Sequence, residues 1–261
     1  MKFFRLVYEA LLQDDPDKKI SLVENIQKLT LGDATSFEPL DSVEEIPIPG
    51  RPSLPELVHP AKVARRKLST LQGRIALIHA ICHIEFNAIN LALDAAYRFQ
   101  SMPKQFYLDW IRVAAEESKH FLLLQKRLLE LDASYGDLPA HNGLWEMAMK
   151  TQHSVVERMA LVPRVLEARG LDVTPGMIER LQAENDSQSV AILQLILHEE
   201  VGHVEIGTRW FRYACEQEQL NPEQTFISLL SQYKISTGNT ELHMQARKEA
   251  GFTQLEIDAL T

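Results

Sequence analysis

WIRVAAEESKHFLLLQ, residues 110–125, carries a glutamate and a histidine three positions apart in the middle of an otherwise apolar helical face. Residues spaced three and four apart share one side of an α-helix. Here that side consists of Trp110, Val113, Ala114, Glu117, His120, Phe121, Leu124 and Leu128. A face of this composition packs into a helical core, where a carboxylate must be neutralised, paired or bound to a metal.

Two further helical faces show the same kind of interruption. In LQLILHEEVGHVEIGTRWF, residues 193–211, Glu200 and His203 break an apolar stripe, and in the stripe at residues 78–96 Glu85 does so. A Glu and a His three apart on a helix point in nearly the same direction, so both can bind one ion. We therefore predict metal binding by Glu85, Glu117, His120, Glu200 and His203.

One carboxylate is missing from this pattern, on the helix between the two Glu-x-x-His pairs, and the candidates are Glu157 and Glu167. Glycine commonly follows the end of a helix, so Gly170 is expected to end this one. Glu157 then lies about 13 residues before the turn, the same depth as Glu200 after a cap at Ser187, whereas Glu167 lies at the helix end. This count favours Glu157 and leaves Glu167 as the alternative.

Helical periodicity covers most of the chain, and the expected fold is all-α. Four long helices with short connections favour an antiparallel four-helix bundle, and they are predicted at about residues 61–99, 104–131, 144–169 and 187–219. Shorter helices, two of them capped by Ser21 and Thr174, are predicted at residues 3–13, 21–29, 174–185, 222–233 and 254–260.

Residues 33–60 contain six prolines, which break helices, so this stretch is expected to form an extended arm on the surface of the main body. We therefore interpret the chain as three segments. The N-terminal helices and the arm occupy residues 1–60, the bundle occupies 61–219, and a C-terminal helical extension occupies 220–261.

The formal net charge of −9 opposes a nucleic-acid partner held by bulk electrostatic attraction. One basic run, Lys62, Arg65, Arg66, Lys67 and Arg74, leaves a nucleic acid open as a substrate. The two cysteines are far apart and do not form a disulfide framework, which predicts a reducing, cytoplasmic compartment. The charged N-terminus predicts no signal peptide, and the absence of about 18 uninterrupted apolar residues predicts no membrane span.

Other polar residues lie near the predicted ligands. His153 and Arg164 share the side of Glu157 and are candidate supporting groups, with Arg164 a candidate to neutralise a carboxylate of the site. His79 and His83 lie on a different face of their helix from Glu85 and are interpreted as packed or surface histidines, with a second metal site or a supporting role as the alternative.

The order Glu, Glu-x-x-His, Glu, Glu-x-x-His on four helices resembles the ferritin-like di-iron and di-manganese carboxylate proteins. The segments VERMALVPRVLEARGLDVTPGM, residues 156–177, and LILHEEVGHVEIGTRWF, residues 195–211, resemble more particularly a bacterial ferritin-like family without an assigned function. That family is distantly similar to the di-iron hydroxylase that modifies a hypermodified adenosine in transfer RNA. In the hydroxylase-like pattern the third-helix ligand precedes an arginine, which Glu157 and Arg158 match.

The resemblance implies two iron or manganese ions, with bridging ligands Glu117 and Glu200, terminal carboxylates Glu85 and Glu157, and nitrogen ligands His120 and His203. It implies an oxidoreductase that activates O2 or peroxide, with hydroxylation as the expected reaction and an external electron donor as a partner. The alternatives are metal handling, by ferroxidase activity or peroxide removal, and a non-catalytic metal-stapled bundle that binds a protein. The substrate and a homodimeric state are left open.

Overall fold

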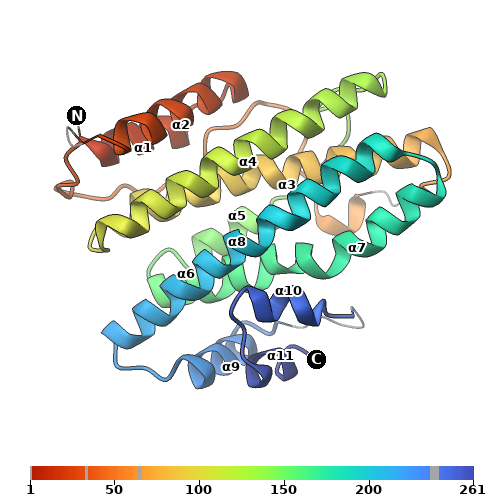
Figure 1. The fold of residues 1–261 in the computed structure, drawn as a ribbon. Coiled ribbons are helices and arrows are strands. Elements are labelled where there is room, and N and C mark those ends of the chain that lie inside the picture. The colour runs from red at the N-terminus through yellow and green to blue at the C-terminus, as the bar shows by residue number, and fades with distance from the viewer. Residues whose placement is uncertain (1, 33–34, 64–65, 236–240) are drawn as a thin grey trace. The chain divides into compact units, whose positions relative to one another are not determined.

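The computed structural model describes residues 2–32, 35–63, 66–235 and 241–261, and all regular secondary structure in those residues is helical (Figure 1). The α-helices are α1 Phe3–Leu12, α2 Pro16–Thr30, α3 Leu71–Arg98, α4 Lys104–Glu130, α5 Gly143–Lys150, α6 Val155–Leu161, α7 Ala168–Ala183, α8 Ser187–Gln217, α9 Pro222–Gln232, α10 Met244–Glu249 and α11 Gln254–Asp258. A 3₁₀ turn, η1, spans Pro60–Lys62, and a π-helical segment, η2, spans Val162–Glu167 between α6 and α7. The all-α prediction is confirmed.

The chain divides into two compact units, Met1–Trp145 and Glu146–Thr261. The three segments predicted from the sequence, residues 1–60, 61–219 and 220–261, are defined by their expected roles and not by compactness. That division stays a prediction.

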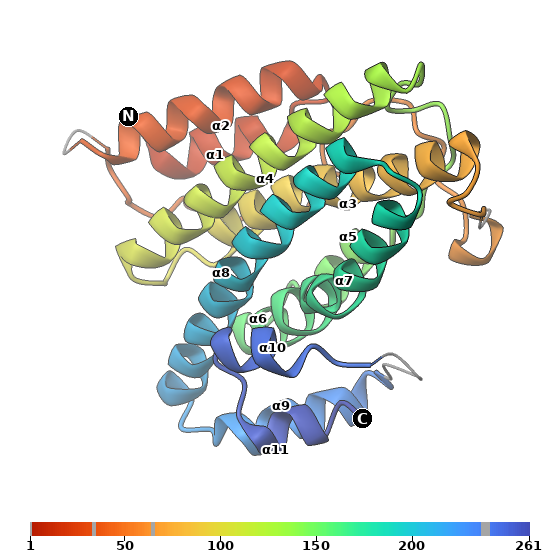
Figure 2. The same cartoon turned by 45° about the vertical axis from the view of Figure 1, so that its right-hand side comes forward.

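In the first unit, α3 and α4 form a helical hairpin, and α1 and α2 pack against it (Figures 1 and 2). The ammonium of Lys19 on α2 is buried and donates hydrogen bonds to the carbonyls of Ala10 and Leu11, at the end of α1, and to Asn90 Oδ1 on α3. Because a buried charge is costly without partners, these three bonds hold α1, α2 and α3 in one arrangement.

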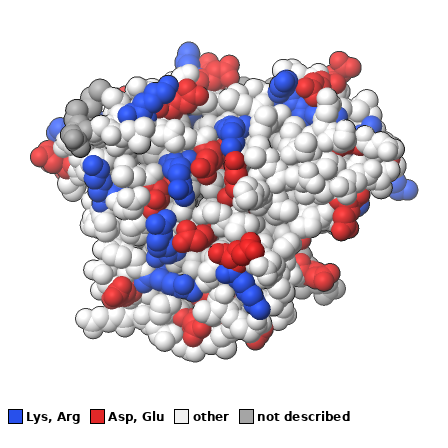
Figure 3. Space-filling view, viewed as in Figure 1, with Lys and Arg blue, Asp and Glu red and all other residues white. Residues whose placement is uncertain are grey.

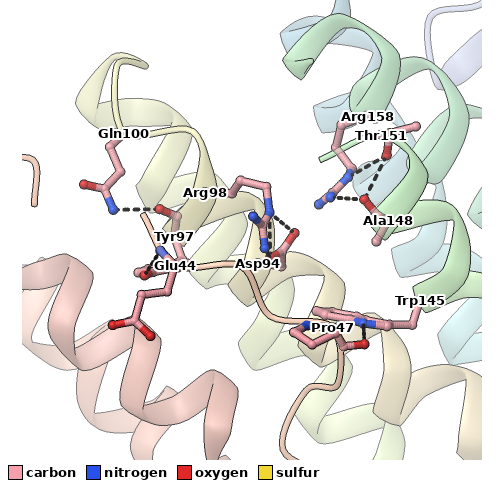
Figure 4. Close-up of polar contacts among 10 residues, drawn as sticks. All are labelled: Glu44, Pro47, Asp94, Tyr97, Arg98, Gln100, Trp145, Ala148, Thr151 and Arg158. Atoms are coloured by element: carbon pink, nitrogen blue, oxygen red, sulfur yellow. Dashed lines mark hydrogen bonds and ion pairs between the residues drawn. The ribbon is translucent and has the colours of Figure 1, made fainter. Parts of the chain in front are cut away.

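The proline-rich arm lies along the first unit, and residues 35–59 contain neither helix nor strand. The backbone N–H of Glu44 donates to the Tyr97 hydroxyl, and the indole N–H of Trp145 donates to the carbonyl of Pro47 at 3.1 Å (Figure 4). These residues of the arm form no helix or strand in which their backbone groups could pair. Side chains of the helices form hydrogen bonds with some of these groups instead.

In the second unit, α6, η2 and α7 follow one another directly as one helical rod, which packs along α8 in the opposite direction. The shorter helices α9 and α10 pack on this pair, and α11 packs on α9 and α10 (Figure 2). Pro163 lies at the start of η2. Because proline has no N–H and its ring crowds the carbonyl four residues earlier, it favours the wider π-helical turn seen there.

Two helices begin at residues other than those predicted. α2 begins five residues before Ser21, because the Asp15 carboxylate accepts a hydrogen bond from the backbone N–H of Lys18 and caps the helix there. α3 begins at Leu71, ten residues later than predicted, because the Thr70 hydroxyl provides its cap. In both cases the helix starts where a side chain satisfies a free amide of the first turn.

The prediction of one helix at residues 144–169 that ends at Gly170 is wrong. Residues 151–154 separate α5 from α6, and the following rod continues through Gly170 and Pro175 to Ala183, so no separate helix is capped by Thr174. The buried side chains of α7 contact α8, and this packing outweighs the local cost of a glycine and a proline inside the helix.

Among the described helices, α3 is long and apolar enough to span a membrane. The most apolar stretch of α3 is 72% buried inside the protein, as expected of a core helix. Lysine, arginine, aspartate and glutamate side chains are interspersed over the face shown in Figure 3. A surface with mixed charges of this kind is typical of soluble proteins.

Candidate metal centre

In the first unit, α3 and α4 bring together three of the predicted ligands. His120 Nδ1 lies 3.0 Å from Glu85 Oε2 and 3.3 Å from Glu117 Oε2. All three side chains are buried, and one potential ligand atom from each lies within 4.8 Å of those from the other two. Two carboxylates and an imidazole that converge in an apolar core could hold a metal ion.

The two carboxylates determine the charge of His120 in the metal-free protein. Burial by itself disfavours the imidazolium, but hydrogen bonds and Coulomb attraction from Glu117 and Glu85 outweigh burial and raise the pKa of His120 to about 11. The imidazolium therefore balances part of the negative charge of the carboxylates when no metal is bound. A divalent cation placed among the same atoms supplies positive charge in place of this proton.

Apolar side chains share the helix faces of these ligands. Ile89, one turn after Glu85 on α3, and Phe121, one turn after Glu117 on α4, are both fully buried. Cys82 is also buried, and burial raises the pKa of its thiol, so it is a neutral packing group.

His79 and His83 are packed histidines, as predicted. His79 Nε2 accepts a hydrogen bond from the backbone N–H of Gly136 at 3.0 Å. His83 Nδ1 lies 3.0 Å from the Tyr135 hydroxyl, and its Nε2 lies 3.2 Å from the carbonyl of His141. Both imidazoles therefore serve to hold the loop that follows α4.

In the second unit, α8 carries the other Glu-x-x-His pair. His203 is buried, Glu200 is partly exposed, and His203 Nδ1 lies 3.2 Å from Glu200 Oε1. This contact repeats the one between His120 and Glu117, because residues three apart on a helix are neighbours.

Two contacts between η2 and α8 establish how the rod and α8 are aligned. A Cβ atom added at Gly207 would lie 2.4 Å from Pro163 Cβ, so the glycine lets the proline ring pack directly on α8. In the next position along each helix, Arg164 Nε donates to Thr208 Oγ1 at 3.2 Å. These contacts place residues 163–164 opposite residues 207–208.

This alignment places Glu167 beside the second Glu-x-x-His pair. Four residues before Gly207 on α8 is His203, and four residues after Pro163 on the antiparallel rod is Glu167. Glu157 lies ten residues before Glu167, which is about 15 Å along the helix axis at 1.5 Å per residue. In the first unit, Glu85 contacts His120 directly, and Glu167 lies at the corresponding level relative to His203.

Glu157 contacts other groups. Its Oε2 lies 3.2 Å from His153 Nε2, and the same carboxylate accepts a hydrogen bond from the Tyr233 hydroxyl. The count that favoured Glu157 over Glu167 took Gly170 as the helix end, and the structure contradicts that premise. His153 does support Glu157, but the alignment with α8 favours Glu167 as the third-helix carboxylate.

Arg158, the arginine after Glu157, joins two helices. Its guanidinium is buried and donates to Thr151 Oγ1 at 2.9 Å and to the carbonyl of Ala148 (Figure 4). These contacts hold the end of α5 against the start of α6. The Glu157–Arg158 match to the hydroxylase-like pattern therefore has a local structural explanation.

Arg164 does not neutralise a predicted ligand, contrary to expectation. Its guanidinium forms a 2.7 Å ion pair with Glu256 on α11, and burial lowers the pKa of Arg164 to about 10 despite the attraction of that carboxylate. Nothing in the local sequence around Arg164 indicates a partner so far along the chain. In the basic run, Arg65 lies outside the described residues, and Arg66 is exposed with Nη1 3.5 Å from Gln72.

Fold and site together define a helical protein with a candidate metal centre. The chain belongs to a family described as a protein of unknown function, DUF455, whose model matches residues 12–258. It is 43% identical over 272 residues to an uncharacterized protein of Haemophilus influenzae, with 98% of this chain and 93% of that relative covered. No solved structure matches the chain.

Proposed function

We propose that this protein is an oxidoreductase that uses two iron or manganese ions to activate O2 or peroxide. Two matched sets of ligands would hold the ions: Glu85, Glu117 and His120 in the first unit, and Glu167, Glu200 and His203 in the second. The observation that carries the proposal is the buried convergence of Glu85, Glu117 and His120.

The chemistry of the donors supports the choice of metal. Carboxylate oxygens combined with imidazole nitrogen suit iron and manganese, whereas thiolates favour zinc or copper and purely oxygen sites favour calcium or magnesium. When bound, iron or manganese supplies the redox chemistry toward O2 or peroxide. The protein's own groups would orient the ions, exclude water with the buried Ile89 and Phe121 on the ligand faces, and give up the His120 proton on metal binding.

The repetition of the ligand set agrees with the ferritin-like pattern that the sequence resembles. In each unit a Glu-x-x-His helix pairs with a helix that carries a single glutamate at the level of the histidine. This repetition is what a ferritin-like four-helix bundle requires, with both sets contributing to one di-metal site. A hydroxylase is the favoured activity within this class because of the resemblance of residues 156–177 and 195–211.

Metal content tests the proposal. Untagged protein would be analysed by mass spectrometry for metals, beside the Glu117→Ala/His203→Ala double variant and a Glu157→Ala control. We expect about two iron or manganese ions per chain in the wild type and the control, and none in the double variant. Well-folded wild-type protein that binds neither metal, even after reconstitution under reducing conditions, would contradict the proposal.

Spectroscopy and oxygen consumption then separate the finer alternatives. Magnetic coupling between the two ions, seen by electron paramagnetic resonance, is expected for one shared centre, and two uncoupled signals would show separate sites. Oxygen or peroxide consumption with a chemical reductant is expected of the metal-loaded protein. Metal-dependent folding without consumption would favour the non-catalytic alternative.

A further inference from the structure

Two buried ion pairs connect the C-terminal helices to the helical rod of the second unit. Arg164 in η2 pairs with Glu256 on α11 at 2.7 Å, and Asp172 on α7 pairs with Arg247 on α10 at 2.6 Å. The four side chains are at most 1% exposed. In one pair the rod supplies the cation and in the other it supplies the anion, so the rod and the C-terminal segment are complementary at two separate points.

Aromatic rings and backbone groups surround both pairs. The Arg164 guanidinium lies 4.6, 4.2 and 4.4 Å from the ring centroids of Phe211, Phe226 and Phe252. The Arg247 guanidinium lies 5.1 Å from the ring of Phe252, so the two pairs share one aromatic side chain. Stacking of this kind offsets part of the cost of removing guanidinium groups from water.

Both carboxylates also accept hydrogen bonds from backbone N–H groups of the C-terminal segment. Glu256 Oε2 accepts a hydrogen bond from the backbone N–H of Thr253 in a capping box, and Asp172 Oδ1 accepts one from the backbone N–H of His243 at 2.9 Å. Arg247 Nε donates to that same Oδ1 at 3.0 Å, which makes its contact with Asp172 bidentate. Bidentate and capped geometries restrict direction as well as distance.

The two pairs lie on either side of Glu167. Arg164 precedes it by three residues, inside the π-helical segment, and Asp172 follows it by five. Buried ion pairs are weak sources of stability compared with apolar packing, and their best-attested use is to specify one arrangement. The arrangement specified here is the position of the short stretch of rod that carries Glu167.

We propose that residues 242–260 act as an internal clamp in which Arg164, Asp172, Arg247 and Glu256 are positioning residues that hold Glu167 level with His203. The effect on metal binding rests on the proposed function, whereas the clamp itself does not. Loosening either ion pair increases local opening of residues 162–172 and weakens the ligand set of the second unit without touching a ligand.

Hydrogen exchange in the metal-free, full-length protein tests the clamp directly. The variants are Glu256→Gln and Asp172→Asn, and the matched control is Asp94→Asn, which removes the charge from the buried Asp94–Arg98 pair of the first unit (Figure 4). We expect amides of residues 162–172 to exchange at least about tenfold faster in the two clamp variants and unchanged in the control. Folded clamp variants whose exchange there stays within about twofold of wild type would overturn the proposal. Glu256→Asp, which keeps the charge, serves if Glu256→Gln does not fold, and it is expected to exchange faster than wild type in the same segment.

Cobalt(II) titration of the apo-protein, followed by its visible absorption, tests the consequence for the site. In Glu256→Gln we expect the affinity for one of two ions to fall about tenfold, as is typical for residues that orient ligands, and Glu256→Asp to restore part of it. Two ions bound as in wild type would overturn the positioning role while leaving the proposed function intact. Wild-type protein that binds no cobalt would instead contradict the proposed function, and the exchange result would then decide the clamp.

Discussion

The helix pair α3–α4 and the pair formed by the rod with α8 present the same residues in different ways. In the first pair both helices are regular α-helices, and His120 directly contacts Glu85 on one helix and Glu117 on the other. In the second pair the single glutamate, Glu167, ends a π-helical segment, and the proline ring of that segment packs on Gly207. The same pattern of two glutamates and a histidine therefore lies on regular α-helices in the first unit, whereas in the second unit one of its glutamates lies in a π-helical segment.

The difference also concerns what supports each pair. In the first unit, the α1–α2 helices and the proline-rich arm pack on the outside of a core whose ligands already contact one another. In the second unit, the C-terminal helices reach the rod through buried ion pairs on both sides of the glutamate. We infer that the first ligand set is organised before metal binds, whereas the second depends on contacts made far along the chain.

The largest expected effect compares the single glutamates of the two units. Glu85→Ala and Glu167→Ala should each lower the affinity for one of the two ions by at least about 100-fold, because each removes a ligand rather than a supporting group. Glu157→Ala should bind both ions as wild type does. Chelator competition measures these affinities, and a loss in Glu157→Ala with none in Glu167→Ala would reverse the assignment.

The packing of η2 on α8 is tested by a second pair of variants. Gly207→Ala should lower the free energy of unfolding by about 1–3 kcal/mol, because its methyl group overlaps Pro163. Gly202→Ala, on the same helix with no atom within 4 Å of the added methyl, should raise it by up to about 1 kcal/mol. Urea denaturation measures both, and equal effects would show that Pro163 does not require the glycine.

The pH dependence of metal binding tests the ligand set of the first unit, which contains His120. The pKa of His120 is raised from 6.5 to about 11, so between pH 6 and 8 metal must displace its proton. Apparent affinity at this set should therefore rise about tenfold per pH unit. Without metal, the imidazolium's contribution to stability is fully present below pH 6.5 and is lost as pH rises toward 11. Calorimetric titration in buffers of different ionisation enthalpy counts the released protons, and a count of zero would contradict the prediction.

The smallest expected effect concerns the outer helices of the first unit. Asp15→Ala should lower the free energy of unfolding by about 1 kcal/mol, because it removes the cap of α2. Ser21→Ala should change it by less than about 0.5 kcal/mol, since that hydroxyl bonds to the Asp17 carbonyl on an exposed helix face. Thermal denaturation measures both effects. A larger effect at Ser21 than at Asp15 would show that Ser21 is the helix cap, as the sequence predicts.

The sequence by itself determined the all-α class and the residues of the buried Glu85–Glu117–His120 cluster, which could hold a metal ion. Helical periodicity places Glu117 beside His120 and Glu200 beside His203 wherever a helix forms, because 3.6 residues make one turn. An apolar stripe must be buried, so the carboxylate of Glu85 on such a stripe was expected to meet charged partners in a core. These inferences depend on neighbours within a few turns, which the sequence displays directly.

Only the tertiary structure showed where the third helix ends and which residue pairs with Arg164, and the proposal of Glu167 over Glu157 rests on that arrangement. Gly170 and Pro175 are local signals for a helix end, yet burial of α7 against α8 carries the helix past both and moves the turn toward residue 186. The choice between the two glutamates depends on how the rod is aligned with α8, and the Arg164–Glu256 pair joins residues on helices far apart in the chain. Alignment and long-range pairing arise from the packing of whole helices, which outweighs propensities of about 1 kcal/mol per residue.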